Sequence, residues 1–413
     1  MICSERLQSF GFFFRVLFVY LCCLVCAPGN ELNEDYRWML IHTSGFHKAE
    51  SIQFADNGTR IRLSAVSKKP VDVDIRNAVA LMQRQPDAFF TPGAEKKKCF
   101  FLELAGGDRV LVRNPVFDGT TLAFHHTVWG RISVDLKYLK RLYRAGASSL
   151  AEPDFTGLIL MNGDQTQGVI SSLSNDSIMV EMEGLGKIPV GGLDRVNEVV
   201  FNKEIKSKEE HRKANVRISL ISGEQIYGKP VSGDKGRWFI QPTWRSKSIP
   251  LFLSFIRAVT FTGGKVFLSD LPHRVQMKKP FAGEFFPMRK DRSLFGNILR
   301  VSQLTADKGI SLHSSTRVDY NLGALKRKPV RFCGMAGIDS EAFFPGASAQ
   351  IRILLDNKPV QTANLKAGGK AIPLFITIPD GTGVLSIETG FGTLGSVSDN
   401  VDILWGSLIY GSE

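Results

Sequence analysis

A pattern repeated along the first 260 residues constrains the fold of this chain more than any other feature. It consists of an apolar strand, a Gly-Asp or Gly-Glu turn, a second apolar strand and an alternating stretch that ends in an aromatic residue. Three clear copies have the sequences FLELAGGDRVLVRN, GLILMNGDQTQGVI and RISLISGEQIYGKP. Their acidic turn residues are Asp108, Asp164 and Glu224, and each is followed 35 to 37 positions later by an aromatic residue. A weaker copy begins near Trp38, so the pattern predicts four copies of one supersecondary unit.

Each copy is built from short alternating strands joined by hairpin turns such as Asn162-Gly163-Asp164. This pattern favours small SH3-like or Sm-like β-barrels, at residues 30–90, 95–146, 155–202 and 214–263. A unit of this size buries too little apolar surface to be stable alone, so we expect neighbouring copies to pack together. Apolar pairs recur at matching offsets within the copies: Ile132 and Val134, Ile188 and Val190, Ile249 and Leu251.

The first 29 residues have the features of a signal peptide. Arg6 and Arg15 precede an apolar run from Val16 to Ala27, and small residues follow it. We therefore expect an exported protein, located in the periplasm, at the cell surface or outside the cell, with an uncleaved anchor as the alternative. Downstream of this segment only Cys99 and Cys333 remain, which excludes a framework of several disulfides.

The chain carries a formal net charge of +12 at pH 7. A basic protein attracts polyanions of any kind, within the range that salt permits. For an exported chain this favours anionic polysaccharide or a lipid surface over nucleic acid as the partner.

The sequence pattern changes after Gly263-Gly264, where longer alternating strands replace the Gly-Asp pattern. Such strands predict a C-terminal jelly-roll β-sandwich at residues 264–413. From Val266 to Tyr410 the sequence resembles the NPCBM modules, carbohydrate-binding domains that are often appended to glycoside hydrolases. The markers stand in order at residues 268–271 (LSDL), 291–296 (DRSLFG), 308–313 (KGISLH), 320–322 (YNL), 337–339 (GID) and 355–358 (LDNK).

A sugar site requires an aromatic face for the C–H patch of the ring and planar polar side chains for the hydroxyl groups. The sequence offers Asp291, His313, Asp399, Asn400 and Trp405 on predicted strand ends or loops. In the resembling family a His usually stands at the place of Asn400, and the Trp comes slightly earlier. Each candidate also has a structural alternative: a core position for Trp405, a hydrogen-bonded structural role for His313, and a turn cap for Asp291.

No cofactor is expected apart from a Ca²⁺ ion. The candidate ligands are Asp339 and Asp402, because carboxylates in loops suit this ion. For Asp339 a turn cap is again the alternative. The chain contains no nucleophile elbow, HExxH motif or P-loop. The sequence therefore predicts a non-catalytic protein that binds a polysaccharide or glycoconjugate. The alternative is a structural or adhesion component of the cell envelope, which contacts other proteins and has a degenerate sugar site.

Overall fold

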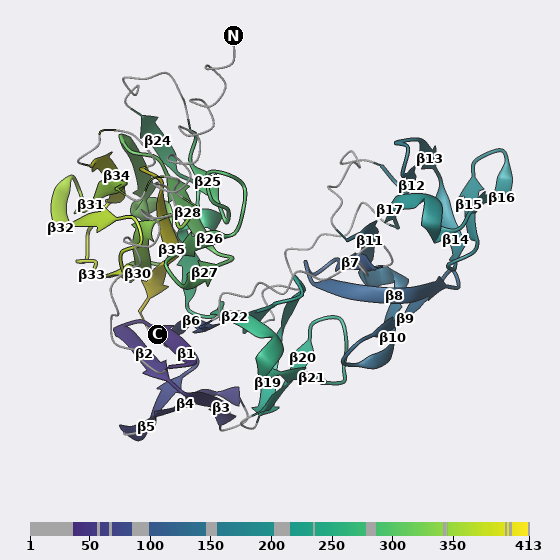
Figure 1. Cartoon of the computed structure of the whole chain (residues 1–413), viewed down its shortest axis with the longest axis horizontal. Coiled ribbons are helices and arrows are strands. Elements are labelled where there is room, and N and C mark those ends of the chain that lie inside the picture. The colour runs from purple at the N-terminus through teal and green to yellow at the C-terminus, as the bar shows by residue number, and fades with distance from the viewer. Residues whose placement is uncertain are drawn as a thin grey trace, which may run out of the picture. The chain divides into compact units, whose positions relative to one another are not determined.

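The computed structural model describes residues 36–55, 58–65, 68–84, 99–145, 155–201, 215–233, 236–277, 286–341, 344, 346–392, 395 and 399–411. The predicted signal peptide at residues 1–29 lies outside these ranges. Within them the regular secondary structure is β-strand and short 3₁₀ turns (Figure 1), which confirms the predicted all-β class. No helix in this part of the chain is long and apolar enough to span a membrane. The SH3-like or Sm-like character of the repeats stays a prediction.

The four segments named here as repeats are meanders of short antiparallel strands. The first repeat contains β1 (Trp38–His42), β2 (Gly45–Ala49), β3 (Ser51–Ala55), β4 (Arg60–Ala65), β5 (Lys68–Asp74) and β6 (Ala78–Gln83). The second contains β7 (Phe100–Leu104), β8 (Arg109–Phe117), β9 (Thr121–His126), β10 (Gly130–Asp135) and β11 (Leu139–Arg144).

The third repeat contains β12 (Gly157–Leu160), β13 (Gln165–Gln167), β14 (Val169–Leu173), β15 (Ile178–Met182), β16 (Gly186–Gly191) and β17 (Val196–Val200). The fourth contains β18 (Val216–Leu220), β19 (Gln225–Gly233), β20 (Arg237–Pro242), β21 (Ile249–Phe252) and β22 (Ile256–Phe261). In the second, third and fourth repeats a 3₁₀ turn directly precedes the last strand, at Leu136–Tyr138, Leu193–Arg195 and Leu253–Phe255.

The repeats pair through their last strands. β11 of the second repeat lies antiparallel to β17 of the third, with Leu142 opposite Val199. β22 of the fourth repeat lies antiparallel to β6 of the first, with Val259 opposite Leu81. The second and third repeats share one apolar core, and the first and fourth share another. Pairing of this kind supplies the buried surface that a single small unit lacks.

The C-terminal segment is a β-sandwich of two antiparallel sheets around a common core. One sheet contains β23 (Lys265–Phe267), β25 (Arg289–Lys290), β28 (Gly309–Leu312), β30 (Pro329–Ile338), β33 (Ile372–Thr377) and β35 (Val401–Tyr410). The other contains β24 (Arg274–Met277), β29 (Thr316–Asn321), β31 (Ser348–Leu355), β32 (Lys358–Lys366) and β34 (Val384–Phe391). A small hairpin of β26 (Leu299–Val301) and β27 (Leu304–Ala306) flanks them.

A separate apolar cluster joins this sandwich to the first and fourth repeats. From the repeats it takes Met39, Ile41, Val79, Ala80, Met82 and Ala258, and from the sandwich Phe267, Leu299, Val301, Leu304, Ala306, Cys333, Met335, Leu404, Trp405 and Ile409. Residues 36–413 accordingly form one compact unit. The sandwich is therefore packed against the repeats through its own core residues.

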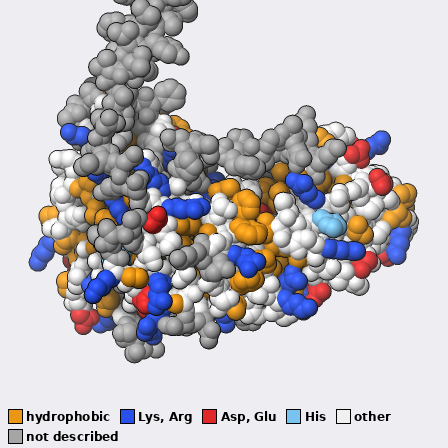
Figure 2. All heavy atoms as spheres, turned by 60° about the horizontal axis from the view of Figure 1, so that its bottom comes forward, with side chains coloured by type: hydrophobic (Ala, Val, Ile, Leu, Met, Phe, Trp, Pro, Cys, Tyr) orange, Lys and Arg blue, Asp and Glu red, His pale blue; other side chains and the backbone are white. Residues whose placement is uncertain are grey.

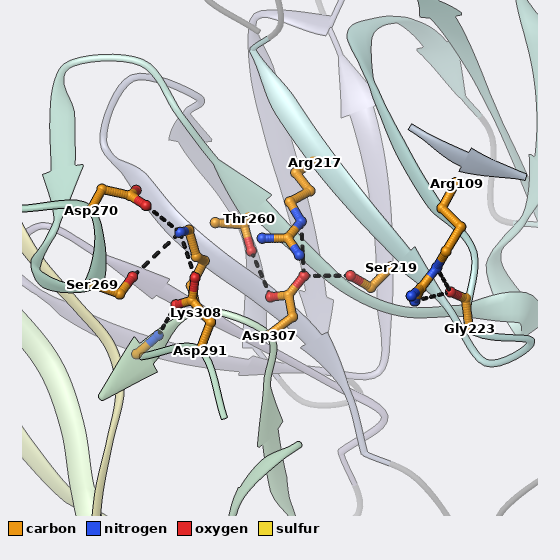
Figure 3. A network of polar contacts seen from close by, with 11 residues as sticks. Arg109, Arg217, Ser219, Gly223, Thr260, Ser269, Asp270, Asp291, Asp307 and Lys308 are labelled. Atoms are coloured by element: carbon orange, nitrogen blue, oxygen red, sulfur yellow. Dashed lines mark hydrogen bonds and ion pairs between the residues drawn. The ribbon is translucent and has the colours of Figure 1, made fainter. Parts of the chain in front are cut away.

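A buried carboxylate fixes the same junction (Figure 3). Asp307, between β27 and β28, accepts hydrogen bonds from Ser219 Oγ at 2.5 Å and Thr260 Oγ1 at 3.2 Å. Its Oδ2 also lies 3.3 Å from Arg217 Nε. All three partners belong to β18 and β22 of the fourth repeat, so a polar contact reinforces the apolar one.

Candidate functional site

Three of the predicted site residues meet at one end of the strand pair β28–β35. The pairing of these strands ends where Leu312 lies opposite Val401. His313 and Asn400 come next on the two chains, and Asp399 precedes Asn400. All three are buried, with exposed fractions of 6%, 4% and 0%. The continuation of two hydrogen-bonded strands is what brings together residues that are far apart in the sequence.

His313 is held by neighbours on several segments. Its Nδ1 lies 3.4 Å from Ser314 Oγ, and its carbonyl oxygen accepts a hydrogen bond from Thr389 Oγ1 at 2.5 Å. The ring of Phe286 lies beside the imidazole, with 5.1 Å between ring centroids and 30° between the ring planes. Phe286 is half-buried, so it places an apolar face next to the polar cluster.

Asp399 has one oxygen atom that the protein does not satisfy. Its Oδ2 accepts a long hydrogen bond of 3.4 Å from the amide of Gly392, whereas its Oδ1 has no hydrogen-bond partner. Burial raises the pKa of Asp399 to about 6, against the opposing effect of the Gly392 amide and the nearby Ser314 hydroxyl. A buried acceptor without a partner is unfavourable, and a hydroxyl group that reached Oδ1 would relieve it. Phe391, next to Gly392, is 49% exposed.

Trp405 lies elsewhere and is a core residue, which corrects the expectation that it stacks on a sugar. Cys333 pairs with Ser407 and Met335 pairs with Leu404, so β35 contains a bulge at Trp405 and Gly406. Trp405 adopts a left-handed φ of 52° there. Bulges redirect side chains, and the indole is fully buried in the cluster that joins the sandwich to the repeats. It presents no face to a ligand.

Asp291 also lies apart from His313. Its amide donates to the carbonyl of Gly309 and its Oδ1 accepts from the Gly309 amide at 3.1 Å, which places it at the start of β28 rather than at the end. Its Oδ2 binds Lys308 Nζ at 2.8 Å, and the same ammonium binds Asp270 at 2.5 Å (Figure 3). These contacts agree with the structural alternative for Asp291.

The two Ca²⁺ candidates are buried carboxylates that already have protein donors. Asp402 accepts from Ser311 Oγ at 2.6 Å and from the Arg300 amide at 3.0 Å. Burial raises the pKa of Asp402 well above its usual value, and the charge of Asp339 raises it further. Asp339 accepts from the Glu341 amide at 3.0 Å, and its Oδ2 has no partner.

Ca²⁺ takes about six to eight oxygen ligands, and Asp339 Oδ2 is the one carboxylate oxygen of this pair without a protein donor. Among the residues with described placement, no group of three or more His, Cys, Asp or Glu side chains is arranged to hold a metal ion. The donor set therefore fits Ca²⁺ poorly, and the Ca²⁺ hypothesis stays a prediction.

The two-sheet sandwich, with polar residues gathered at one strand end, has a counterpart among known domain families. Residues 264–408 match the NPCBM/NEW2 domain. The predicted resemblance, from Val266 to Tyr410, is thereby confirmed. His313, Asp399 and Asn400 all lie within the matched NPCBM/NEW2 segment, and so does Phe286. Comparison with curated proteins gives no match.

Solved structures similar to this chain include carbohydrate-binding modules. One is the CBM51 module from GH95 of Clostridium perfringens in complex with methyl-galactose, with 23% identity, a TM-score of 0.31 and coverage of 35% of this chain and 99% of that one. Another contains the CBM51-2 and INT domains of Clostridium perfringens ZmpB with GlcNAc, with 16% identity, a TM-score of 0.32 and coverage of 56% and 43%. A third contains the tandem CBM51 modules of Sp3GH98 from Streptococcus pneumoniae SP3-BS71, with 13% identity, a TM-score of 0.32 and coverage of 62% and 88%.

Sequence reasoning missed Phe286. It stands 27 positions before His313, outside the strand patterns and the family markers. An aromatic residue in an irregular segment carries no periodic signal, so only the three-dimensional arrangement identifies it as a neighbour of the imidazole.

Proposed function

We propose that this protein binds a carbohydrate through its NPCBM/NEW2 domain, at the end of the β28–β35 pair. The observation that carries this proposal is the group of His313, Asn400 and Asp399 beside the half-buried ring of Phe286. A sugar ring combines an apolar C–H face with hydroxyl groups, so an aromatic ring and planar polar side chains bind its two kinds of surface together.

Each residue has a distinct role in this proposal. Phe286 contacts the C–H face of the sugar. His313 and Asn400 orient sugar hydroxyl groups, and Asp399, which is fully buried, accepts a hydroxyl hydrogen bond through its partnerless Oδ1 when the sugar displaces the residues that cover it. Galactose-type and N-acetylglucosamine-type sugars are reasonable first ligands to test, because modules of the similar solved structures were obtained with methyl-galactose and GlcNAc.

We infer further that the protein is exported and non-catalytic. The support for export is the apolar run from Val16 to Ala27 behind two arginines. The support for a binding role without catalysis is the match of residues 264–408 to a carbohydrate-binding domain family. Periplasm, cell surface and extracellular space all suit such a protein.

An envelope component that contacts other proteins is the second candidate. The observation that favours it is the burial of Trp405 and His313, at 0% and 6% exposure, because neither ring presents an open face on which a sugar could stack. This candidate requires no sugar site at His313.

A glycan array probed with the full-length protein tests the proposal. We expect retention on a defined set of glycans, with loss of retention in Asp399→Asn and Phe286→Ala. Asp291→Asn is the matched control, because Asp291 is an aspartate of the same domain that lies at the other end of β28. Equal loss in the control and in Asp399→Asn, or no retention of the wild type, would favour the envelope component.

A further inference from the structure

The second and fourth repeats cover each other through a matching pair of backbone contacts, one made in each direction. Asp108 Oδ1 accepts a hydrogen bond from the Tyr227 amide at 2.8 Å, and Glu224 Oε1 accepts one from the Leu111 amide at 3.0 Å. Each donor stands three positions after the acidic turn residue of its own repeat. Both carboxylates are buried. The acidic turns that define the sequence repeat are thus contact points between repeats.

Two tryptophans complete this reciprocal interface. Trp129, in the turn between β9 and β10, packs against the core of the first and fourth repeats and donates its Nε1 hydrogen to the Pro250 carbonyl at 2.9 Å. Trp244, in the turn between β20 and β21, packs into the core of the second and third repeats. The apolar residues beneath these rings are 1–2% exposed: Ile132 and Val134 on β10, Ile249 and Leu251 on β21.

The third repeat has the same elements, but they are exposed to solvent. Met182 pairs with Gly186 across the turn between β15 and β16, as His126 pairs with Gly130 across the turn that carries Trp129. Leu185 therefore occupies the place of Trp129, and its side chain is 69% exposed.

The strand beneath this turn is open as well. Ile188 and Val190 on β16 match Ile132 and Val134 on β10, yet they are only half-buried, with Val190 also packed against the core shared by the second and third repeats. Asp164, which matches the buried Asp108, is exposed and bonds with Asn162 in its own turn. The third repeat thus has the three elements of the interface: an apolar residue in the turn, an apolar strand and an acidic turn. Among the described residues, no other repeat covers these elements as the second and fourth repeats cover each other.

We propose that this face of the third repeat docks a second copy of the chain, whose third repeat covers it reciprocally. Leu185 of each copy packs onto Ile188 and Val190 of the other. The occupant follows from the chain itself, because a face with these elements is covered by another repeat of the same design in the second and fourth repeats. A two-fold contact needs only one self-complementary patch.

The distribution of exposed apolar side chains agrees with this surface. Among the described residues, the three most exposed large hydrophobic side chains are Leu185, Val169 and Met161, at 69%, 61% and 63%, and all three belong to the third repeat. Of the three, Leu185 lies in the proposed face, where removing its apolar surface from water would favour association. Figure 2 shows hydrophobic side chains at the surface beside charged ones on one face of the molecule.

The reciprocal geometry also predicts a weak point in the contact. In the existing interface Asp108 lies 3.4 Å from the Thr243 hydroxyl, nineteen positions after Glu224. Counted in this direction, the matching residue of the third repeat is Glu183, which would meet Asp164 of the other copy. In the other direction Glu224 Oε1 lies 2.8 Å from His126 Nε2, and the residue that matches His126 is the uncharged Met182. Two carboxylates that approach each other oppose association, so the dimer should be weaker than one with threonine at this position.

Sedimentation equilibrium of the full-length protein tests the proposal. We expect a reversible monomer–dimer equilibrium, weakened at least about thirtyfold by Leu185→Asp, since a charge at a central apolar contact removes a dominant part of the binding energy. The matched control is Val360→Asp, because Val360 is an apolar residue of the sandwich with 47% exposure; it should leave the equilibrium unchanged. Glu183→Thr should tighten the dimer.

Three results would overturn the proposal. The first is a wild-type protein that stays monomeric up to about 0.1 mM, a concentration at which weak specific dimers form. The second is a dimer that Leu185→Asp does not weaken, which would place the contact on another face. The third is a dimer that Glu183→Thr leaves unchanged or weakens, because the reciprocal placement of Asp164 and Glu183 would then be wrong. If the wild type stays monomeric but binds a different protein, the proposal is overturned in the same way as by the first result.

Discussion

Replacing Asp307 with asparagine should destabilise the junction between the sandwich and the fourth repeat. Asp307 is 7% exposed, and asparagine keeps its size while removing its charge. Burial by itself would raise the pKa of Asp307, but the Arg217 guanidinium and the Ser219 hydroxyl outweigh burial and hold the pKa below its usual value. The carboxylate is therefore the counter-charge for a guanidinium whose side chain is only 12% exposed.

The magnitude follows from the charge that remains behind. Removing one partner of a buried ion pair leaves the other uncompensated, which costs about 3–5 kcal/mol. Replacing both partners with apolar residues of similar size is often neutral. We therefore expect Asp307→Asn to lower the free energy of unfolding by about 3 kcal/mol. Combining it with Arg217→Met should recover part of this loss, because the uncompensated guanidinium is removed while an amide oxygen can still accept from Ser219 and Thr260.

Urea unfolding followed by tryptophan fluorescence measures these differences. Because the pKa of Asp307 is depressed in the folded state, its stabilising effect is present above the pKa of an unfolded aspartate and disappears as the pH falls through the folded value. The wild type and Asp307→Asn should therefore converge in strongly acidic solution. A loss below about 1 kcal/mol at pH 7, or a double variant as unstable as Asp307→Asn, would refute this account of the junction.

Three further predictions concern other buried groups. Trp405→Ala should lower the free energy of unfolding by about 3–5 kcal/mol, because the indole fills the junction cluster, and chemical denaturation measures this loss. Burial raises the pKa of Asp108 to about 7. The free energy of unfolding should therefore fall by up to about 4 kcal/mol as the pH rises from the pKa of an unfolded aspartate to 7. Denaturation of Asp108→Asn at several pH values should lack this fall. Burial raises the pKa of the Cys333 thiol to about 12, so a disulfide reagent should modify it only as the protein unfolds, whereas rapid reaction in the native state would contradict its placement.

The strands and turns of the repeats could be predicted because their signals are local. Gly-Asp turns and alternating apolar residues specify each hairpin over a few positions. The pairing of the repeats could not be derived in this way. That β22 joins β6, from the opposite end of the repeat region, depends on which apolar faces meet after the hairpins have formed.

In the candidate site, too, the local features could be predicted and the long-range contacts could not. His313 and Asn400 could be selected as polar residues at strand ends, and the register of β28 with β35 brings them together. Asp291 has the same chemical character, but a sequence motif does not say at which end of a strand a side chain will lie. The bulge that turns Trp405 into the junction has no sequence signal of its own, since it arises from the pairing of β35 with β30.

The pH dependence of sugar binding tests whether the ionisation of Asp399, and not only its side chain, contributes to the affinity. Burial places the pKa of Asp399 near 6, and the ionised carboxylate accepts stronger hydrogen bonds than the neutral acid does. Affinity for a glycan should therefore rise between pH 5 and pH 7 in the wild type, and this rise should be absent in Asp399→Asn when both are measured by calorimetric titration.

Calorimetric titration of the full-length protein with a glycan selected on the array shows whether a sugar binds beside Phe286. We expect saturable binding that Phe286→Ala weakens about tenfold, since an aromatic contact contributes roughly 0.5–1.5 kcal/mol in addition to the apolar area it buries. Phe391→Ala is the matched control, because this ring is exposed next to Gly392 and has no assigned contact with the sugar; it should change the affinity less. Unchanged affinity in Phe286→Ala, or no binding by the wild type, would mean that no sugar binds beside this ring.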